Sequence, residues 1–288
     1  MWGSPGAVIS SGGVLVHSHA ASSPRAHWRL LTEGLWGLGF ELSFRVVKER
    51  DEVSPPAWAL ATLERQIRRA QAGGAPPDAH CVLVEAEALV PGGESELGAL
   101  AFARDPQVPA IRSPHAEVPV WQLVPLTHDE ARLVREWSPS GLIEVLSVVD
   151  PLLIADAQRS SLLLSPRARQ VIEQRVAREG SSLSSMQARV SSVIRTKDAA
   201  TWRLSKDAVD TLIALLKGRT AHQRSFTVRG AGAPLEVRPG DVPGLEPAQA
   251  GHVLKLSQSA ARQLRAHLKG RPGRYGLDAL PGFTVEVV

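Results

Sequence analysis

The sequence has little cysteine, little lysine and few aromatic residues, and each shortage narrows the range of functions. Cys81 is the only cysteine among 288 residues, so no disulfide forms within the chain and a reducing cytoplasm is the expected compartment. We expect Cys81 to be a small buried apolar residue. Only six of the 33 basic residues are lysines, and a net charge of +4 is too small to indicate a nucleic-acid-binding protein. No apolar run approaches the roughly 20 residues of a membrane span.

Sequence motifs of catalysis are also missing. The chain holds no Gly-x-Ser-x-Gly, no glycine-rich phosphate loop and no His-Glu-x-x-His. His17 and His19 would share one face of a strand and could pair as metal ligands, but no third ligand accompanies them. Asp129 and Glu130 are adjacent carboxylates that a helix capping box beginning at Thr127 explains. The sequence therefore predicts no enzyme, no cofactor and no metal site.

The most informative stretch is a strand-like segment that is followed by a helix start. Residues 40–45 alternate between apolar and polar, which predicts a strand with its even-numbered side chains buried and its odd-numbered ones in solvent. A helix is predicted over 56–72, with Ser54 as its cap. Phe40 and Trp58 are expected to be core anchors, whose replacement would harm folding.

Further helices and strands mix along the chain without a regular βαβ alternation, so the class is α+β with two mixed α/β lobes. Helices are predicted over 127–137, 139–146, 166–179, 205–217 and 257–269, and strands over 81–88, 97–104, 118–124, 152–155, 183–194, 225–228, 235–237, 252–256 and 283–288. The polar run 195–200 is the expected boundary between the lobes. The chain would then comprise a loosely ordered N-terminal arm (1–24), a larger domain (25–195) and a smaller C-terminal α+β domain (196–288).

Six blocks of this sequence resemble, in the same order, blocks of the Suppressor of fused family. They are 27–35 (HWRLLTEGL), 39–45 with 55–58 (GFELSFR and PPAW), 104–108 (RDPQV), 141–146 (GLIEVL), 152–159 (LLIADAQR) and 179–188 (EGSSLSSMQA). The C-terminal part also resembles the family loosely, at 216–219 and 222–227. This resemblance implies a non-catalytic fold that binds proteins or peptides, with a cleft between its two domains.

The resemblance also has departures that affect the expected partner. The long acidic insert of the animal members is missing, and Ser225 stands where those members have a cleft-lining histidine. This argues against the animal ligand, a short motif of a zinc-finger transcription factor. The chain looks like a bacterial member, and such members are commonly proposed to be immunity proteins that neutralise a toxin.

The resemblance implies that a partner strand is held in the cleft between two segments of this chain. These segments are 97–105, which ends in Arg104 and Asp105, and 184–188, which includes Met186 and Ala188. Both read as edge strands, whose unpaired backbone groups accept an added strand. Asp105 would lie at the cleft mouth and accept hydrogen bonds from the partner, Met186 would form an apolar floor, and Ala188 would leave room.

Two residues of the second domain, His222 and Arg224, would complete this partner-binding clamp. Structural alternatives stay open for these residues: Asp105 as a turn residue before Pro106, His222 as a packing or surface residue, and Arg224 as a solvated strand residue.

We therefore expect a cytoplasmic protein-binding module that takes a protein or peptide, most plausibly a cognate toxin, by strand addition. The alternative is a nucleic-acid-associated regulatory protein that uses a basic helix surface. Its candidate residues are Arg65, Arg68, Arg69, Arg132 and Arg135. Neighbouring acids and the scarcity of aromatic stacking partners favour a solvated helix face instead.

Overall fold

The protein is described by a computed structural model over residues 8–74, 77–78, 82–84, 88–92, 95–112, 117–268 and 270–288. Its contacts divide the chain into two compact units. Unit 1 comprises Met1–Arg132 and Pro139–Ile172, and unit 2 comprises Leu133–Ser138 and Glu173–Val288. Cys81 lies outside the described residues, so its expected burial stays a prediction.

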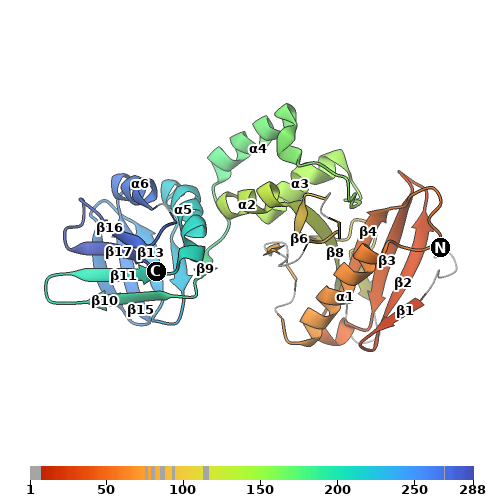
Figure 1. The fold of residues 1–288 in the computed structure, drawn as a ribbon, viewed down its shortest axis with the longest axis horizontal. Helices are drawn as coiled ribbons and strands as arrows, with labels where there is room; N and C mark the ends of the chain where they lie inside the picture. The colour runs from red at the N-terminus through yellow and green to blue at the C-terminus, as the bar shows by residue number, and fades with distance from the viewer. Residues whose placement is uncertain are drawn as a thin grey trace. The chain divides into compact units, whose positions relative to one another are not determined.

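Unit 1 is built on an eight-stranded sheet in the order β1-β2-β3-β4-β8-β6-β5, with β7 paired to β8 (Figure 1). Its elements are β1 (Val8–Ser11), β2 (Val14–Ala21), β3 (His27–Glu33), η1 (Trp36–Leu38), β4 (Glu41–Val47), α1 (Ala57–Gln71), β5 (Val82–Val84), β6 (Leu97–Arg104), β7 (Ala110–Arg112), β8 (Glu117–Thr127), α3 (Pro139–Val149) and η2 (Leu162–Leu164). Two helices cross the division between the units, α2 (His128–Glu136) and α4 (Pro166–Glu179). All strand pairs of this sheet are antiparallel except β4 with β8.

The segment expected to be a loose N-terminal arm instead contributes two strands to this sheet. β2 pairs with β3 along its whole length, from Leu15 opposite Glu33 to Ala21 opposite His27. Val14 is buried in the core beneath α1. The expectation was wrong because the alternation of apolar residues is short and lies among glycines and serines. Such a segment becomes a stable strand only through its pairing with β3.

Helix α1 covers one face of the sheet and confirms the helix predicted over 56–72 (Figure 1). Its buried side chains Leu63 and Ile67 pack with the even-numbered side chains of β4, among them Phe44. The predicted cap was wrong, because Pro56 occupies the cap position and no side chain caps the helix. Proline is suited to this position, since its missing N–H leaves no donor to satisfy.

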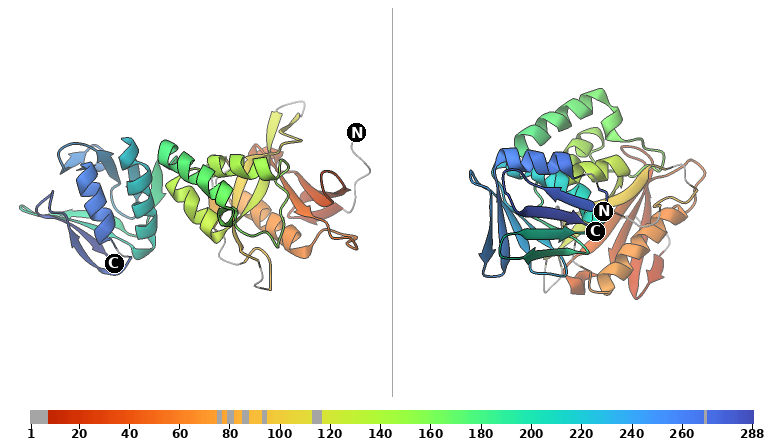
Figure 2. Two further views of the ribbon diagram at one scale, coloured as in Figure 1. Left: turned by 90° about the horizontal axis from the view of Figure 1, so that it is seen from above. Right: turned by 60° about the vertical axis from the view of Figure 1, so that its left-hand side comes forward.

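Unit 2 holds a four-stranded sheet, β10-β11-β17-β16, and a five-stranded sheet, β14-β15-β13-β12-β9. Its elements are β9 (Ser185–Gln187), β10 (Ser191–Arg195), β11 (Ala200–Leu204), η3 (Lys206–Ala208), α5 (Val209–Gly218), η4 (Thr220–His222), β12 (Phe226–Arg229), β13 (Leu235–Pro239), β14 (Gly244–Ala248), β15 (Gly251–Leu256), α6 (Gln258–His267), β16 (Gly273–Gly276) and β17 (Phe283–Val287). Helices α5 and α6 lie side by side in this unit (Figure 2). Ser257 caps α6 as predicted, accepting a hydrogen bond from the Ala260 amide.

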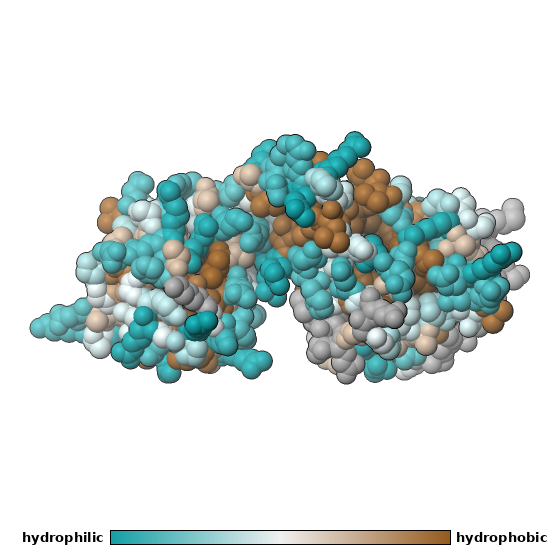
Figure 3. Space-filling model, turned by 45° about the horizontal axis from the view of Figure 1, so that its top comes forward, coloured by the Kyte–Doolittle hydropathy of each residue, from teal (hydrophilic) through white to brown (hydrophobic). Residues whose placement is uncertain are grey.

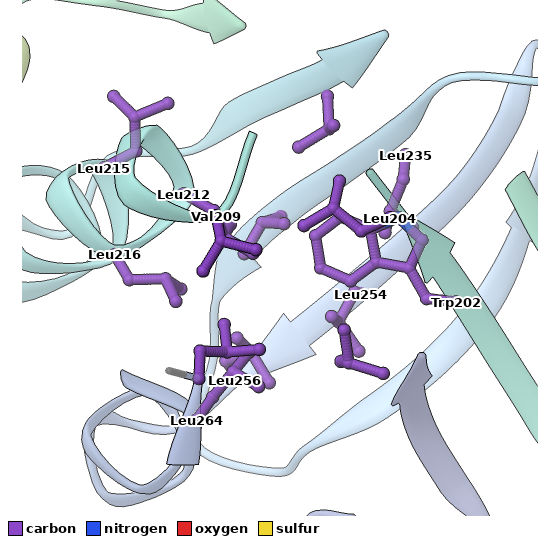
Figure 4. Close-up of a cluster of buried hydrophobic side chains, with 14 of the residues drawn as sticks. Trp202, Leu204, Val209, Leu212, Leu215, Leu216, Leu235, Leu254, Leu256 and Leu264 are labelled. Carbon is purple, nitrogen blue, oxygen red and sulfur yellow. The ribbon is translucent and has the colours of Figure 1, made fainter. Parts of the chain in front are cut away.

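The core of unit 2 gathers leucines from its helices and sheets around Trp202 of β11 (Figure 4). Leu212 and Leu216 enter it from α5 and Leu264 from α6, while Leu254 comes from β15. This periodicity on α5 is the one that predicted a helix over 205–217. The mixture of helices with sheets of both parallel and antiparallel pairs confirms the α+β class.

Three local expectations differ from the structure. The strand expected over 183–194 is two strands in different sheets, β9 and β10. The strand expected over 152–155 is a turn, from which Ala155 alone bridges to Val46. The boundary expected near Arg195 lies at the turn of the β10–β11 hairpin, inside unit 2. Of the helices in the described part of the chain, none combines the length and the hydrophobicity that crossing a bilayer requires.

Candidate functional site

Strand β9 forms one edge of the five-stranded sheet of unit 2. It pairs in parallel with β12, with Met186 opposite Val228. Beyond β9, no other described strand joins the sheet. The expectation of an edge strand at 184–188 is therefore confirmed, and an edge strand presents a row of unpaired backbone groups.

The hydrogen bonds of β9 show which of its backbone groups face outward. The Ser184 carbonyl accepts from Thr227, and the Ala188 amide donates to the Arg229 carbonyl, at 3.0 and 2.8 Å. Because backbone groups alternate along a strand, residues 184, 186 and 188 face β12. The N–H and C=O groups of Ser185 and Gln187 therefore point away from the sheet, in the direction that an added strand would approach.

The segment that leads into β9 is held by a cluster of basic side chains. Arg219 donates to the carbonyls of Ser225 (2.7 Å) and Ser181 (3.1 Å), and Arg224 also reaches the Ser181 carbonyl (3.4 Å). Burial and the neighbouring Arg224 charge lower the pKa of Arg219 from its ordinary value. Unit 2 thus brings together Arg224 and the approach to β9, and sequence reasoning had not singled out Arg219.

His222 packs against the same segment. A side-chain carbon added at Gly180 would lie 2.4 Å from the His222 ring and 2.3 Å from the Gly218 carbonyl. Gly180 also has a φ of +63°, as a residue that ends a helix often does. The packing alternative for His222 is therefore the one that this contact supports.

Met186 and Ala188 have a different role from the one expected. Both side chains are buried in the core of unit 2, on the inward face of the strand. They hold β9 in place and do not line an open floor. In this unit the outward backbone groups, and not these side chains, are what a partner strand would contact.

In unit 1 the corresponding segment is β6, which has β8 on one side along its length. On the other side it pairs with β5 at Ala99, Leu100 and Ala101, so the expectation that 97–105 is an edge strand was wrong: β6 lies inside the sheet. No described residue pairs with 102–104 on that side. Arg104, at the end of the strand, is exposed and lies 4.3 Å from the centre of the Trp121 ring, a cation–π contact.

Asp105 is buried, and this corrects its expected position at a cleft mouth. Its side chain is 1% exposed. The carboxylate accepts two hydrogen bonds from Arg45 at 2.8 Å, one from Ser43 at 2.5 Å, and one from each amide of Gln107 and Val108 at 2.8 Å. These bonds occupy the carboxylate, so it has a structural role and is not presented to a partner. The alternative, in which Asp105 is a turn residue before Pro106 that binds its own backbone, agrees with the bonds that Asp105 accepts from the amides of Gln107 and Val108.

The charged group facing Asp105 is the fully buried guanidinium of Arg45 on β4. Arg45 also donates to the side-chain oxygens of Gln122 and Gln107. Burial alone would raise the pKa of Asp105, but the hydrogen bonds and charge of Arg45, together with Ser43, lower it below its ordinary value. The polar face of β4 is therefore an internal network and not a solvated face, contrary to the prediction from its alternation.

The candidate residues thus form two groups, Arg104 and Asp105 in unit 1 and Met186, Ala188, His222 and Arg224 in unit 2. That these groups line a common cleft stays a prediction. His17 pairs with Glu33 (2.6 Å), and no group of three or more metal-ligating side chains occurs among the described residues.

Comparisons with known proteins relate both sequence and fold to one family. The family model for Suppressor of fused protein (SUFU) matches residues 14–160. Suppressor of fused homologs of Mus musculus and Homo sapiens are 28% and 27% identical to the chain over 174 residues, covering 57% of this chain and 35% of each relative. The chain thus spans about a third of the length of these relatives. The crystal structure of Drosophila Suppressor of Fused has a similar fold, with a TM-score of 0.72, 17% identity, and coverage of 95% of this chain and 88% of that one.

Proposed function

The chain belongs to the Suppressor of fused family, and we propose that it acts by binding a segment of another protein and not by catalysis. The observation that carries this proposal is the outer edge of β9, with the backbone groups of Ser185 and Gln187 directed away from the sheet. An extended segment that adds to such an edge gains main-chain hydrogen bonds with little demand on its sequence.

We extend the proposal to a segment that also reaches residues 102–104 at the end of β6. Its support is that Arg104 is exposed and that the pairing of β6 with β5 extends, among the described residues, to Ala101. Arg104 and Arg224 would then recognise the partner's side chains, whereas Asp105, Met186, Ala188 and His222 would hold the two strands in shape.

The biological role that we propose is that of a bacterial immunity protein, which neutralises a toxin in the cytoplasm. Support comes from the preference for arginine over lysine, which is typical of GC-rich bacterial genomes, and from the lack of the acidic insert of the animal members. The nucleic-acid alternative has less support. On α1, Arg68 pairs with Glu64 (3.6 Å) and Arg65 donates to Thr62 (3.4 Å), as on an ordinary solvated helix face.

Affinity purification from the encoding organism tests the strand-addition mechanism. The full chain is compared with Gln187→Pro, which removes an outward N–H, and with Gln187→Ala, which keeps it. We expect a protein that is recovered with the wild type and with Gln187→Ala, and lost with Gln187→Pro. Equal recovery with all three would remove β9 from the proposal, while recovery of nuclease-sensitive nucleic acid alone would favour the alternative.

Co-expression then tests the immunity role separately. A recovered protein that stops growth when expressed alone, and is tolerated when the full chain is co-expressed, would support it. If the recovered protein does not stop growth, the immunity role is contradicted, whereas the strand-addition mechanism is unaffected.

A further inference from the structure

Unit 1 contains a cavity of about 560 Å³ that is separate from both strands discussed above. Its walls are the end of α3, the turn that follows it, part of β8, residues 24–25, and residues 159–162 with Ser165. The volume lies within the range of about 300–1,000 Å³ that is typical of binding pockets. Because all lining residues belong to unit 1, the cavity is complete within that unit.

Part of the cavity wall is apolar, and apolar side chains are also exposed near it. Val124, Leu146 and Ile154 form buried parts of the wall. Val149, which lines the cavity, is 69% exposed, and Leu164 of η2, which follows the lining residue Leu162 by two positions, is 61% exposed. Figure 3 shows hydrophobic side chains gathered at the surface in the upper middle of the view, beside and below the hydrophilic side chains at its top. An exposed apolar surface of this kind is typical of a site for a macromolecule, since a small molecule would cover only the cavity.

One wall of the cavity is fixed in a strained conformation. Leu153 has a φ of +51°, a value that leucine rarely adopts. Asp150 holds the turn by accepting hydrogen bonds from the amides of Leu152 and Ile154, and Gln122 donates to the carbonyls of Leu152 (2.8 Å) and Leu153 (3.0 Å). Strain that the surroundings enforce in this way is found preferentially at binding sites, where it keeps a surface in its binding shape.

The charges inside and outside the mouth differ. Inside, Arg25 pairs with Asp150 (3.0 Å) and Asp156 (3.4 Å), while Arg159 forms a two-pronged pair with the buried Glu130. The positive groups of the wall are therefore neutralised.

Outside the mouth, the first turns of α4 expose Arg169. Arg169 donates to the carbonyl of Leu163 (2.8 Å), next to Leu162 of the cavity wall, and no carboxylate in the described part of the chain pairs with its guanidinium. This arginine is thus available to a carboxylate from elsewhere, beside the cavity.

We propose that this cavity and its mouth are a second protein-docking surface, which receives an acidic amphipathic segment. The segment inserts one or two large apolar side chains into the cavity, covers Val149, and places a carboxylate beside Arg169. Apolar anchors in a preformed pocket supply most of the affinity of such contacts, and charge pairs at the rim supply selectivity.

The test is selection of a random dodecapeptide display library on the immobilised full chain, with counter-selection on Val149→Glu. We expect the retained peptides to carry leucine, phenylalanine or tryptophan flanked by aspartate or glutamate. Their affinities are then measured by fluorescence anisotropy. Val149→Glu should weaken binding at least tenfold, and Arg169→Glu about threefold or more, with a loss of the salt dependence that the wild type shows.

Matched controls are Val242→Glu and Arg262→Glu, which change exposed residues of the same types in unit 2 and should leave the affinity unchanged. The proposal is overturned if no peptides are retained, if they lack acidic residues, or if all four variants bind alike. It is also overturned if small apolar probes such as anilinonaphthalene sulfonate bind the cavity while the peptides do not. Gln187→Pro should not affect these peptides, so this result and that of the β9 proposal are independent.

Discussion

Arg45 and Asp105 form a two-pronged ion pair inside unit 1, with both N–O distances at 2.8 Å and side chains 0% and 1% exposed. The pair joins the polar face of β4 to the residue that follows β6, sixty positions further along the chain. A charge buried this deeply is tolerated only when its partner and further hydrogen bonds are in place. The polar residues of the most informative sequence block are therefore part of the core.

Removing one member of this pair should unfold much of unit 1. Asp105→Ala leaves the Arg45 guanidinium buried without its counter-charge, which costs about 3–5 kcal/mol in free energy of unfolding. Urea denaturation measures this loss. Asp198→Ala, at an exposed aspartate of unit 2, should change stability by less than about 0.5 kcal/mol. A stable Asp105→Ala variant would show that the pair is not structural.

The free energy of unfolding should decrease when the solution is made acidic and should change little near neutral pH. The pKa of Asp105 is lower in the folded chain than its ordinary value, so the folded state binds this proton less readily than the unfolded state. Its contribution is complete above the unfolded pKa of about 4 and is lost as pH falls through the folded pKa. Glu179 acts in the same direction, because hydrogen bonds from Arg175 lower its pKa to about 2 despite burial.

Thermal denaturation at pH 7, 5, 4 and 3 checks this expectation. The melting temperature should be nearly constant between pH 7 and 5 and should drop below pH 4. Asp105→Asn should be less stable at pH 7 and should lose less between pH 5 and 3 than the wild type. An equal acid-induced drop in both proteins would assign the effect to other carboxylates.

The expectation about β4 failed for a physical reason. Alternation within 40–45 shows that the two faces differ, but it does not show that both are covered. The residues that make the polar face tolerable, Asp105 and Gln122, lie about sixty and eighty positions away, and no local pattern connects them to Arg45. Sequence therefore predicted the strand and its apolar face, while the internal network required the tertiary structure.

Proline substitutions at two neighbouring positions of β9 should destabilise the fold to different extents. Gln187→Pro removes an N–H that points away from the sheet, so it should cost less than about 1 kcal/mol. Met186→Pro removes an N–H that faces β12 and truncates a buried side chain, and should cost about 3 kcal/mol or more. Chemical denaturation of both variants compares them. Similar losses would contradict the assignment of the outward groups.

Two tryptophans of unit 1 should respond differently to truncation. Trp58 packs edge-to-face on Phe44, with ring centres 5.6 Å apart, and Trp58→Ala should cost about 2–4 kcal/mol. Trp36 is 62% exposed, so Trp36→Ala should stay within about 0.5 kcal/mol. The difference is measured from the denaturant concentrations at the midpoints of unfolding, for variants whose free energy of unfolding depends equally steeply on denaturant concentration. Equal destabilisation would mean that Trp58 is not a core anchor.

Of the two expected edge strands, one is confirmed and one was wrong, because β6 lies between β8 and β5. The segment at 184–188 is an edge strand as expected, because its serines do not fit the centre of a sheet. The burial of Met186 and Ala188 was missed, since β9 has only three residues and its inward face is set by β12. Helix α4 was predicted from Pro166 and Gly180, which are strong local signals.

Two separate segments of the chain form unit 2, Leu133–Ser138 and Glu173–Val288. Trp137, in the first segment, is fully buried and donates its indole N–H to Glu179, while its carbonyl accepts from the Ser182 amide. Cleavage of the chain at a single position therefore releases neither unit intact. A cut just before residue 133 separates the first segment of unit 1 from its second segment, 139–172. A cut just after residue 172 leaves the C-terminal fragment without Trp137. Neither unit is one continuous segment, so recombination between genes could not exchange one unit alone. We therefore expect the two units to be inherited together.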